Sequence, residues 1–219
     1  MNGFSVFLAS YPIKKFTRGD VVLHQDAEPS CVFFIKSGII KSYNLTSKGE
    51  ERPIELNTHF DIFPIGWFLD KISKSQYYYE ALEDSELYCI SKGELTTFLR
   101  NNSETMFQLL HRQVERSTHT EVRINALEHS RAFDKIISTL HYFALRFGRD
   151  IRRNTVKIPV PLTQQDVANF TGLTRETVSA EFKKLSQQKI IGRQKQEYVI
   201  NTNKLDELLD DSFEHHFIR

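Results

Sequence analysis

The sequence predicts an α+β protein, in which antiparallel strands forming a barrel or jelly roll precede one long helix and a C-terminal winged helix-turn-helix. Three observations support this fold class. The first hundred residues contain many short apolar runs separated by turn residues. Residues 103–129 contain neither Pro nor Gly and carry a heptad pattern. Residues 163–191 contain two short helical patterns on either side of a glycine.

The N-terminal strands are marked by their turns. We expect strands on both sides of Gly19-Asp20 and of Ser37-Gly38, and a hairpin tip at Gly49. The runs QYYYEAL and SELYCI predict two more strands. Because many short strands follow one another at regular spacing, residues 1–102 are expected to form one β domain.

The three consecutive tyrosines and the two cysteines in these strands can each be interpreted as functional or as structural residues. Tyr77, Tyr78 and Tyr79 alternate across a strand; they could form an aromatic platform for a ligand, but packing of the sheet faces is the interpretation we favour. Cys31 and Cys89 lie inside apolar runs and are expected to be buried, reduced thiols, with a redox-sensing pair as the alternative.

The long helix of residues 103–129 has an apolar seam suited to pairing with a second helix. Positions spaced alternately four and three apart form the a and d positions of a two-stranded coiled coil. This seam is apolar at its ends and polar in its middle. The alternative is that the helix packs on its own β domain, as Phe107 and Val114 on another face are expected to do. The predicted dimerisation residues are Met106, Leu110, Gln113, Ser117, Thr120, Ile124 and Leu127.

A further helix is expected in RAFDKIISTLHYFALRFG, followed by RDIRRNTVK as a loop. Four arginines lie around this loop, and we expect them to be solvated or close to phosphates. The tail KLDELLDDSFEHHFIR predicts a short acidic amphipathic helix. The arginines are Arg146, Arg149, Arg152 and Arg153.

Residues 163–191 predict two helices joined by a tight turn. Thr163 is placed to cap the first helix, and Gly172 can adopt the left-handed backbone angles of the turn. The second helix, residues 174–187, starts behind Thr174. Its spacing of i, i+4 and i+7 predicts one buried stripe. That stripe consists of Val178, Phe182 and Leu185.

The opposite face of the second helix carries side chains that suit a DNA major groove. Arginine bonds guanine in a bidentate manner, glutamate accepts from the cytosine amino group, and serine bonds either kind of edge. The alternative is an ordinary helical hairpin with a solvated charged face. The expected DNA-facing residues of this helix are Arg175, Glu176, Ser179 and Lys183.

The segment GRQKQEYVI strengthens the DNA-binding interpretation. Gly192 followed by alternating Tyr198 and Ile200 predicts a small hairpin, or wing. Arg193 and Lys195 in this hairpin are expected to contact phosphates.

The charge of the chain is concentrated in its C-terminal part. Residues 131–203 contain 13 Lys and Arg against 6 Asp and Glu, whereas residues 1–130 contain 14 against 17. The basic part is therefore the part with the helix-turn-helix pattern, as attraction to phosphates requires. No apolar run is long enough to span a bilayer and the N-terminus shows no basic-then-apolar leader pattern, so a cytoplasmic protein without a membrane partner is expected.

The run LTRETVSAEFKKLSQQKII resembles the DNA-binding helix of the CRP/FNR family of bacterial transcription regulators. This resemblance implies a homodimer that binds an inverted-repeat operator, with RNA polymerase as a further partner. It implies that Thr163, Gln164 and Thr174 contact phosphates and that Arg175, Glu176 and Ser179 contact bases. The family commonly has an arginine where this chain has Ala180, so the operator preference of other members does not transfer.

The spacing of Gly19, Gly38 and Gly49 is similar to that of the β-roll in the cyclic-nucleotide-binding superfamily. In that superfamily a Gly-Glu pair and an Arg-Ser pair bind the ribose and the cyclic phosphate. The corresponding positions here are Pro64, Ile65, Ser75 and Gln76, and all the charged partners are missing. A phosphate buried without its cation is costly.

We therefore expect no response to cyclic AMP or cyclic GMP. An effector, if one exists, is expected to be an unidentified, less polar small molecule near Ile65, Trp67 and Thr120. The N-terminal cysteines of iron–sulfur members are absent from the sequence, and no cofactor or metal is predicted.

Taken together, these patterns predict a β-roll sensor at residues 1–102, a dimerisation helix at 103–129 and a winged helix-turn-helix domain at 130–219. No catalytic motif is present, so an enzyme is not expected. The predicted function is a DNA-binding transcription regulator. The alternative is a ligand-binding sensor whose winged helix contacts another protein, and salt-dependent binding to random duplex DNA separates the two.

Overall fold

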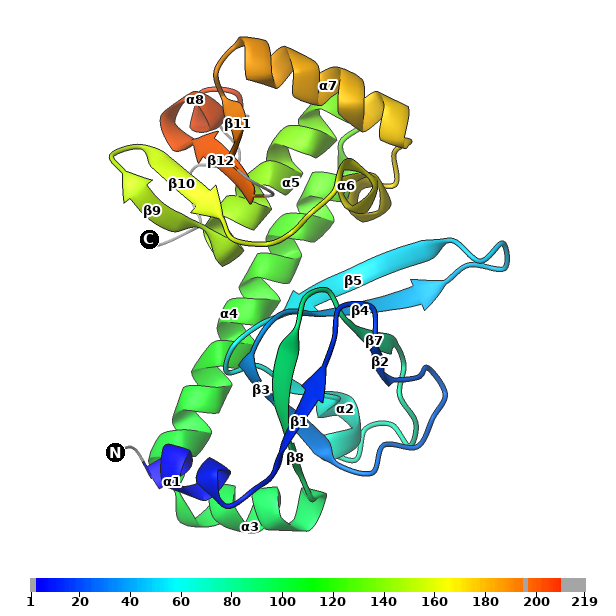
Figure 1. The fold of residues 1–219 in the computed structure, drawn as a ribbon, viewed down its shortest axis with the longest axis vertical. Coiled ribbons are helices and arrows are strands. Elements are labelled where there is room, and N and C mark those ends of the chain that lie inside the picture. Colours follow the sequence, from blue (N-terminus) through cyan, green and yellow to red (C-terminus); the bar gives the residue numbers. More distant parts are fainter. Residues whose placement is uncertain (1–2, 195–196, 210–219) are drawn as a thin grey trace. The chain divides into compact units, whose positions relative to one another are not determined.

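The computed structural model describes residues 3–194 and 197–209, and the chain divides into two compact units at Glu115 and Arg116 (Figure 1). Unit 1 contains two four-stranded antiparallel sheets, and unit 2 contains helices and one four-stranded antiparallel sheet. The predicted α+β fold class is confirmed. Within the described residues no helix combines the length and the apolar character that crossing a membrane requires.

The two sheets of unit 1 have the strand orders β1-β8-β3-β6 and β2-β7-β4-β5. The expected strands around Gly19-Asp20 and Ser37-Gly38 and in the two later runs are present, and the hairpin expected at Gly49 joins β4 to β5, whereas β6 was not expected. Gly38 turns the chain with φ +92°, and a Cβ there would lie 2.1 Å from Ser85 Oγ. The strands are β1 (Ile13–Phe16), β2 (Val21–Leu23), β3 (Val32–Ser37), β4 (Ile40–Leu45), β5 (Glu51–Asn57), β6 (Ile62–Phe63), β7 (Tyr78–Ala81) and β8 (Ser85–Ile90).

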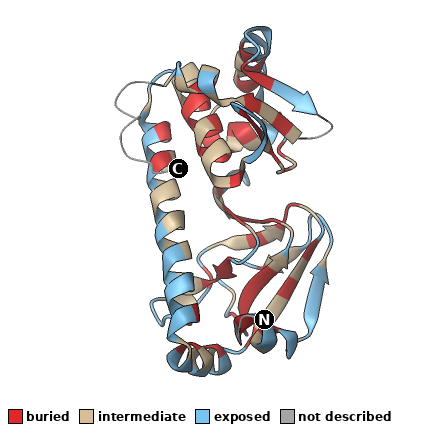
Figure 2. Cartoon of the chain, turned by 90° about the vertical axis from the view of Figure 1, so that its left-hand side faces the viewer, coloured by how far each residue is buried: buried red, intermediate tan, exposed pale blue. Residues whose placement is uncertain are grey.

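Strand β3 is buried on both faces because its side chains alternate between two apolar clusters (Figure 2). Phe33 and Ile35 pack with Ile40 of β4 and fill the space between the two sheets. Val32 and Phe34 face the other way and pack with residues of the helices. This double burial explains why the run VFFI is continuously apolar.

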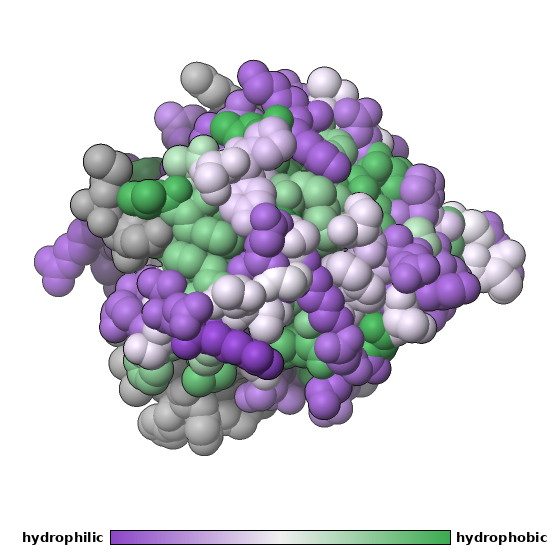
Figure 3. All heavy atoms as spheres, turned by 90° about the horizontal axis from the view of Figure 1, so that it is seen from below, coloured by the Kyte–Doolittle hydropathy of each residue, from purple (hydrophilic) through white to green (hydrophobic). Residues whose placement is uncertain are grey.

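Helices cover the outer face of the first sheet, and the three that precede the long helix were not expected from the sequence. Phe4 and Leu8 of α1 are buried against this face, one helical turn apart. Phe7 of α1 stacks on Phe98 of α3, with ring centroids 4.0 Å apart. Figure 3 views the molecule from below. On this face apolar side chains are exposed between polar ones. The helices are α1 (Gly3–Ala9), α2 (Ile65–Phe68) and α3 (Lys92–Asn101), followed by α4 (Ser103–Glu128).

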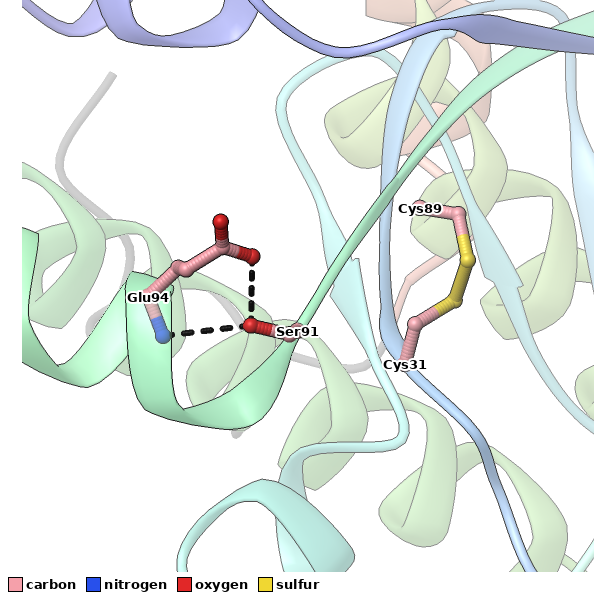
Figure 4. Close-up of a disulfide and its surroundings, with 4 residues drawn as sticks. All are labelled: Cys31, Cys89, Ser91 and Glu94. Atoms are coloured by element: carbon pink, nitrogen blue, oxygen red, sulfur yellow. Dashed lines mark hydrogen bonds between the residues drawn. A yellow bond between two sulfur atoms is a disulfide. The ribbon is translucent and has the colours of Figure 1, made fainter.

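The expectation of two reduced thiols is wrong. Cys31 and Cys89 are joined by a disulfide, with their α-carbons 5.5 Å apart (Figure 4). They were expected in separate apolar runs, but β3 and β8 pair so that Phe33 faces Cys89. The two cysteines therefore lie diagonally across neighbouring strands on one face of the sheet.

The segment expected as the loop RDIRRNTVK is a β-hairpin in unit 2. Asn154 makes the turn with φ +58°, a left-handed conformation that asparagine tolerates. Val156 and Ile158 alternate into the core, which the arginine-rich half of the segment obscured. The strand order of this sheet is β11-β12-β10-β9. The elements are α5 (Ala132–Phe147), β9 (Arg149–Arg152), β10 (Thr155–Ile158), α6 (Gln164–Thr171), α7 (Arg175–Gln187), β11 (Ile191–Gln194), β12 (Glu197–Asn201) and α8 (Thr202–Asp206).

Candidate nucleic-acid interface

A capping box starts α6, the first helix of the helix-turn-helix. The Thr163 hydroxyl accepts from the backbone N–H of Asp166 at 3.1 Å. In return the Asp166 carboxylate accepts from the Thr163 backbone N–H at 2.7 Å and from its hydroxyl at 2.6 Å. These reciprocal bonds satisfy helix-end donors and fix where α6 begins.

The turn between α6 and α7 depends on Gly172, which has φ +68° and ends α6. Behind this turn the Thr174 hydroxyl accepts from the backbone N–H of Thr177 at 3.2 Å and caps α7. The two helices contact each other, and Phe170 of α6 and Val178 of α7 are both buried.

The predicted DNA-facing side chains lie on the exposed face of α7. Arg175, Glu176, Ser179 and Lys183 are all exposed, while Val178, Phe182 and Leu185 are buried. Within the part of the chain that the structure describes, these four exposed side chains form no ion pair or hydrogen bond with other side chains. They are therefore available to an external partner. Of the other expected contacts, Thr163 and Thr174 are exposed and Gln164 is half-buried.

The wing packs against α7 through an aromatic contact that the sequence did not reveal. Tyr198 of β12 meets Phe182 of α7 edge to face, with ring centroids 5.4 Å apart. On the wing itself, Arg193 pairs with Tyr198 across the strands, and its guanidinium lies 5.4 Å from the tyrosine ring centroid. Arg193 is exposed, and Lys195 lies outside the described residues.

Tyr198 carries a buried hydroxyl with no hydrogen-bond partner among the described residues. Burial raises the pKa of this hydroxyl, the Arg193 cation opposes that shift, and the Asp166 carboxylate adds to it. The phenol is therefore neutral at physiological pH and contributes packing rather than charge.

A second contact that the sequence did not predict holds α6 in place. The Arg123 guanidinium, from the second half of α4, lies 4.9 Å from the ring centroid of Phe170. Cation–π pairs of this kind stabilise a packed ring by about 0.5–2 kcal/mol. No pattern in the sequence links two residues so far apart.

The arginine cluster around β9 is not part of this face. Arg149 and Arg152 are exposed on an edge strand, with β10 and β12 between them and the wing strand β11. The Arg152 Nε donates to the Thr155 hydroxyl at 3.3 Å, and Arg146 stacks on Phe147. These arginines therefore form a separate basic edge.

The exposed apolar side chains of α4 coincide only in part with the expected seam: Met106, Leu110 and Ile124 belong to both. Figure 2 shows that much of the first half of this helix is exposed. Phe107 is 66% exposed and Val114 is 57% exposed, so the expectation that they pack on their own β domain is wrong. Their exposure follows from the helix register, because Thr105 and Leu109 take the inward positions. Of the seven predicted seam residues, Met106, Leu110, Ser117 and Ile124 are exposed, whereas Gln113, Thr120 and Leu127 are half-buried.

The positions expected to correspond to a cyclic-nucleotide cassette have other structural roles. Pro64 is the N-cap of α2, and Ile65 packs against the apolar cluster under the helices. Ser75 is buried and its hydroxyl donates to the Tyr77 carbonyl at 2.7 Å, while Gln76 is exposed.

The tyrosine run and Phe63, which precedes Pro64, form aromatic stacks. The Phe63 ring stacks on Tyr79 with centroids 4.3 Å apart and on Phe33 at 5.2 Å. Tyr78 stacks on Tyr43 from the other face of the strand. These contacts support sheet packing as the role of the tyrosine run.

Comparison with known proteins agrees with both units. Residues 13–102 match the family model of the cyclic nucleotide-binding domain, and residues 134–208 match that of the Crp-like helix-turn-helix domain. The chain is 25% identical to the probable transcriptional regulator flp of Lacticaseibacillus casei over 198 residues, which cover 89% of this chain and 85% of that protein. It is 23% identical to the global nitrogen regulator of a Nostoc strain over 190 residues, which cover 86% and 85%.

The fold also matches a solved structure. FixK2 from Bradyrhizobium japonicum superposes with a TM-score of 0.74 at 20% identity, covering 91% of this chain and 98% of that one. Regulators with a Crp-like helix-turn-helix domain bind DNA and are typically dimeric. The two matched domains, their order and these relatives show that the chain belongs to the CRP/FNR family of transcriptional regulators, which are not enzymes.

Proposed function

We propose that this regulator is a homodimer that binds an inverted-repeat operator by placing α7 in the major groove and the wing on neighbouring phosphates. The observation that carries the proposal is the exposed face of α7, where Arg175 and Glu176 stand at the start of a firmly capped helix. These side chain types bond guanine and cytosine edges, and Lys183 further along the helix adds a cation.

Salt-dependent DNA binding tests this proposal directly. Binding of labelled duplexes, first random and then selected for affinity, is measured by fluorescence anisotropy between about 50 and 200 mM salt. The affinity should fall steeply with added salt, and Arg175→Ala should weaken binding to the selected duplex. Arg100→Ala, which removes an exposed arginine from α3 in unit 1, is the matched control. A protein that binds no duplex at low salt would instead favour the alternative function, a sensor that contacts another protein.

The proposed dimer forms through the exposed stripe of α4. Five large apolar side chains there are between 45% and 66% exposed, and apolar side chains exposed on one helix are suited to a second copy. Between Val114 and Ile124 the exposed residues include Ser117 and Glu121, so the proposed pairing is apolar at both ends and polar between them. The stripe residues are Met106, Phe107, Leu110, Val114 and Ile124.

A cavity borders the same stripe. It has a volume of about 570 Å³ and is lined by α1, by the first half of α4 and by Phe60. Beside it Arg112 donates to the His59 carbonyl at 2.6 Å and lies 3.6 Å from the buried Asp61 carboxylate. Side chains of a second copy would cover Phe107 and this cavity together.

The control of this regulator is proposed to be independent of cyclic nucleotides. Pro64 offers no backbone N–H to a phosphate, and Ser75 already donates its hydroxyl to a carbonyl. Any small-molecule effector would then be less polar than a cyclic nucleotide. Contact with RNA polymerase belongs to the same proposal, and the basic edge at Arg149 and Arg152 is a surface of unit 2 that DNA bound by α7 would leave uncovered.

A further inference from the structure

The chain has two cysteines, and the fold brings them together in unit 1 (Figure 4). Cys31 directly precedes β3, and Cys89 is the penultimate residue of β8. Their α-carbons are 5.5 Å apart, within the range that a disulfide requires. Paired strands hold this separation, so the two sulfur atoms can form or break their bond without rearrangement of the sheet.

The disulfide is not needed to build unit 1. Strands β3 and β8 are already paired along most of their length, and apolar clusters cover both faces of their sheet. Units of about 100 residues fold on such a core alone, whereas disulfides are characteristic of smaller secreted domains. A protein that binds chromosomal DNA works in a compartment where persistent disulfides are rare and those present are usually redox sites.

We propose that Cys31 and Cys89 form a redox-modification site, whose substrate is a dithiol reductant and whose oxidation state sets the affinity of the regulator for DNA. This inference rests on the proposed function, since its output is DNA binding. The β-roll would then respond to the thiol redox state. Its residues at the cyclic-nucleotide cassette positions make other contacts within the fold.

The exchange proceeds by two displacements. Cys89 is half-buried and Cys31 is only 3% exposed, so a thiolate of the reductant attacks the sulfur of Cys89. The S–S bond breaks and Cys31 leaves as a thiolate. The second thiol of the reductant then attacks the reductant sulfur that is bonded to Cys89. This forms the disulfide of the reductant and releases Cys89 as a thiolate. Two electrons and two protons pass from the reductant to the protein, and the reductant becomes a disulfide.

The position of Cys89 connects this exchange to the helices that follow. Ser91, two residues later, caps α3: its hydroxyl accepts from the backbone N–H of Glu94 at 3.3 Å and donates to the Glu94 carboxylate (Figure 4). Ile90, between them, is fully buried with Leu95 of α3. The chain then passes from α3 into α4, which carries the proposed dimer stripe. Breaking the cross-link leaves the β3–β8 pairing in place but removes one covalent restraint next to the cap of α3.

The test compares oxidised and reduced full-length protein. The protein is treated with graded concentrations of dithiothreitol, and its free thiols are counted by alkylation and mass spectrometry. Their number should rise from zero to two in one reversible step. Trp67 is the sole tryptophan and packs on the cluster that contains Ile90, so its fluorescence should change in the same step. The reduced protein should bind a selected duplex at least about fivefold more weakly, a typical coupling between two sites. Cys31→Ser/Cys89→Ser should have one affinity at every reductant concentration.

Two outcomes would overturn the inference. One is a bond that opens only when the protein unfolds. The other is a bond that opens in the folded protein and lowers its Tm, while both forms bind DNA within fivefold of each other; the disulfide would then be a structural cross-link. Equal binding by both forms refutes only the redox inference, whereas absence of DNA binding by both forms refutes the proposed function.

Discussion

Phe182 of the proposed recognition helix and Tyr198 of the wing meet edge to face, with ring centroids 5.4 Å apart. This contact joins the two elements expected to touch DNA, and both rings are buried. Arg193 lies over the same tyrosine, so the wing cation is positioned by the contact that holds the helix. The stability of unit 2 and the placement of its DNA-contacting side chains therefore depend on the same residues.

Substitutions at Tyr198 should separate packing from hydrogen bonding. Because its buried hydroxyl has no partner among the described residues, Tyr198→Phe should leave the free energy of unfolding unchanged or raise it by up to about 1 kcal/mol. Tyr198→Ala removes the ring and should lower it by about 3–5 kcal/mol. Urea denaturation followed by circular dichroism measures both. A loss of more than about 1 kcal/mol in Tyr198→Phe would mean that the hydroxyl is bonded.

Glu176 and Lys183 should differ in how they affect DNA recognition. Glu176→Ala should relax the preference for one base pair in each half-site, at a cost of about 1–3 kcal/mol at that position. Lys183→Ala should weaken binding uniformly and reduce the salt slope by about one unit. Competition with duplexes substituted base by base distinguishes the two effects. If Glu176→Ala keeps the full base preference, α7 does not dock as proposed.

The dimer prediction concerns α4. Glutamate at both Leu110 and Ile124 should give a monomer that no longer binds its operator specifically, because the charges would be buried against a second copy. Phe107→Glu should weaken the dimer more than Gln113→Glu, because Phe107 is the more exposed of the two. Sedimentation velocity measures the association, and Thr97→Glu on the exposed side of α3 is the control.

In the dimer the two copies of α7 should contact half-sites centred about one helical turn, roughly 34 Å, apart. A protein that sediments as a monomer both with and without DNA would rule out this arrangement.

Alkaline pH should destabilise unit 1 through Tyr43. Burial and the hydrogen bond from its hydroxyl to Glu80, 2.9 Å long, raise the pKa of Tyr43 in the folded protein. In the unfolded chain the Tyr43 hydroxyl loses its proton near pH 10. The stabilisation that the raised pKa gives the folded protein is therefore complete below about pH 10 and declines as the pH rises further. Tyr43→Phe should therefore lose less stability than the unmodified protein above about pH 10. Tyr88→Phe, in the same unit, is the control.

Cyclic AMP and cyclic GMP should neither bind with micromolar affinity nor strengthen operator binding. The cassette positions lack cations, so the charge of a buried cyclic phosphate would be left uncompensated. Isothermal titration against the full-length protein tests binding, and anisotropy tests the effect on DNA. A micromolar dissociation constant with a matching gain in operator affinity would contradict the proposed independence.

The sequence predicted the elements whose signals are local. The helix-turn-helix was predictable because caps at Thr163 and Thr174 and the glycine between them act over only three or four residues. The strands around Ser37-Gly38 were predictable for the same reason. The hairpin at Asn154 was missed because its outer strand is arginine-rich and exposed on every residue, so it shows no alternation.

Contacts between distant segments were not predictable. The pairing of Cys31 with Cys89 depends on the register of β3 against β8, which the apolar pattern of either strand leaves open. The exposure of Phe107 depends on which face of α4 the β domain covers. A heptad pattern in an amphipathic helix permits neighbouring choices of seam, and only packing decides between them.

The capping box at the start of α6 also affects how this helix can meet DNA. A helix N-terminus attracts anions, but here the Asp166 carboxylate already accepts from the Thr163 hydroxyl and backbone N–H. A phosphate arriving at this end would meet a resident negative charge and a hydroxyl that has no proton left to give. Phosphate attraction should then come from Lys183 and the wing rather than from the N-terminus of α6.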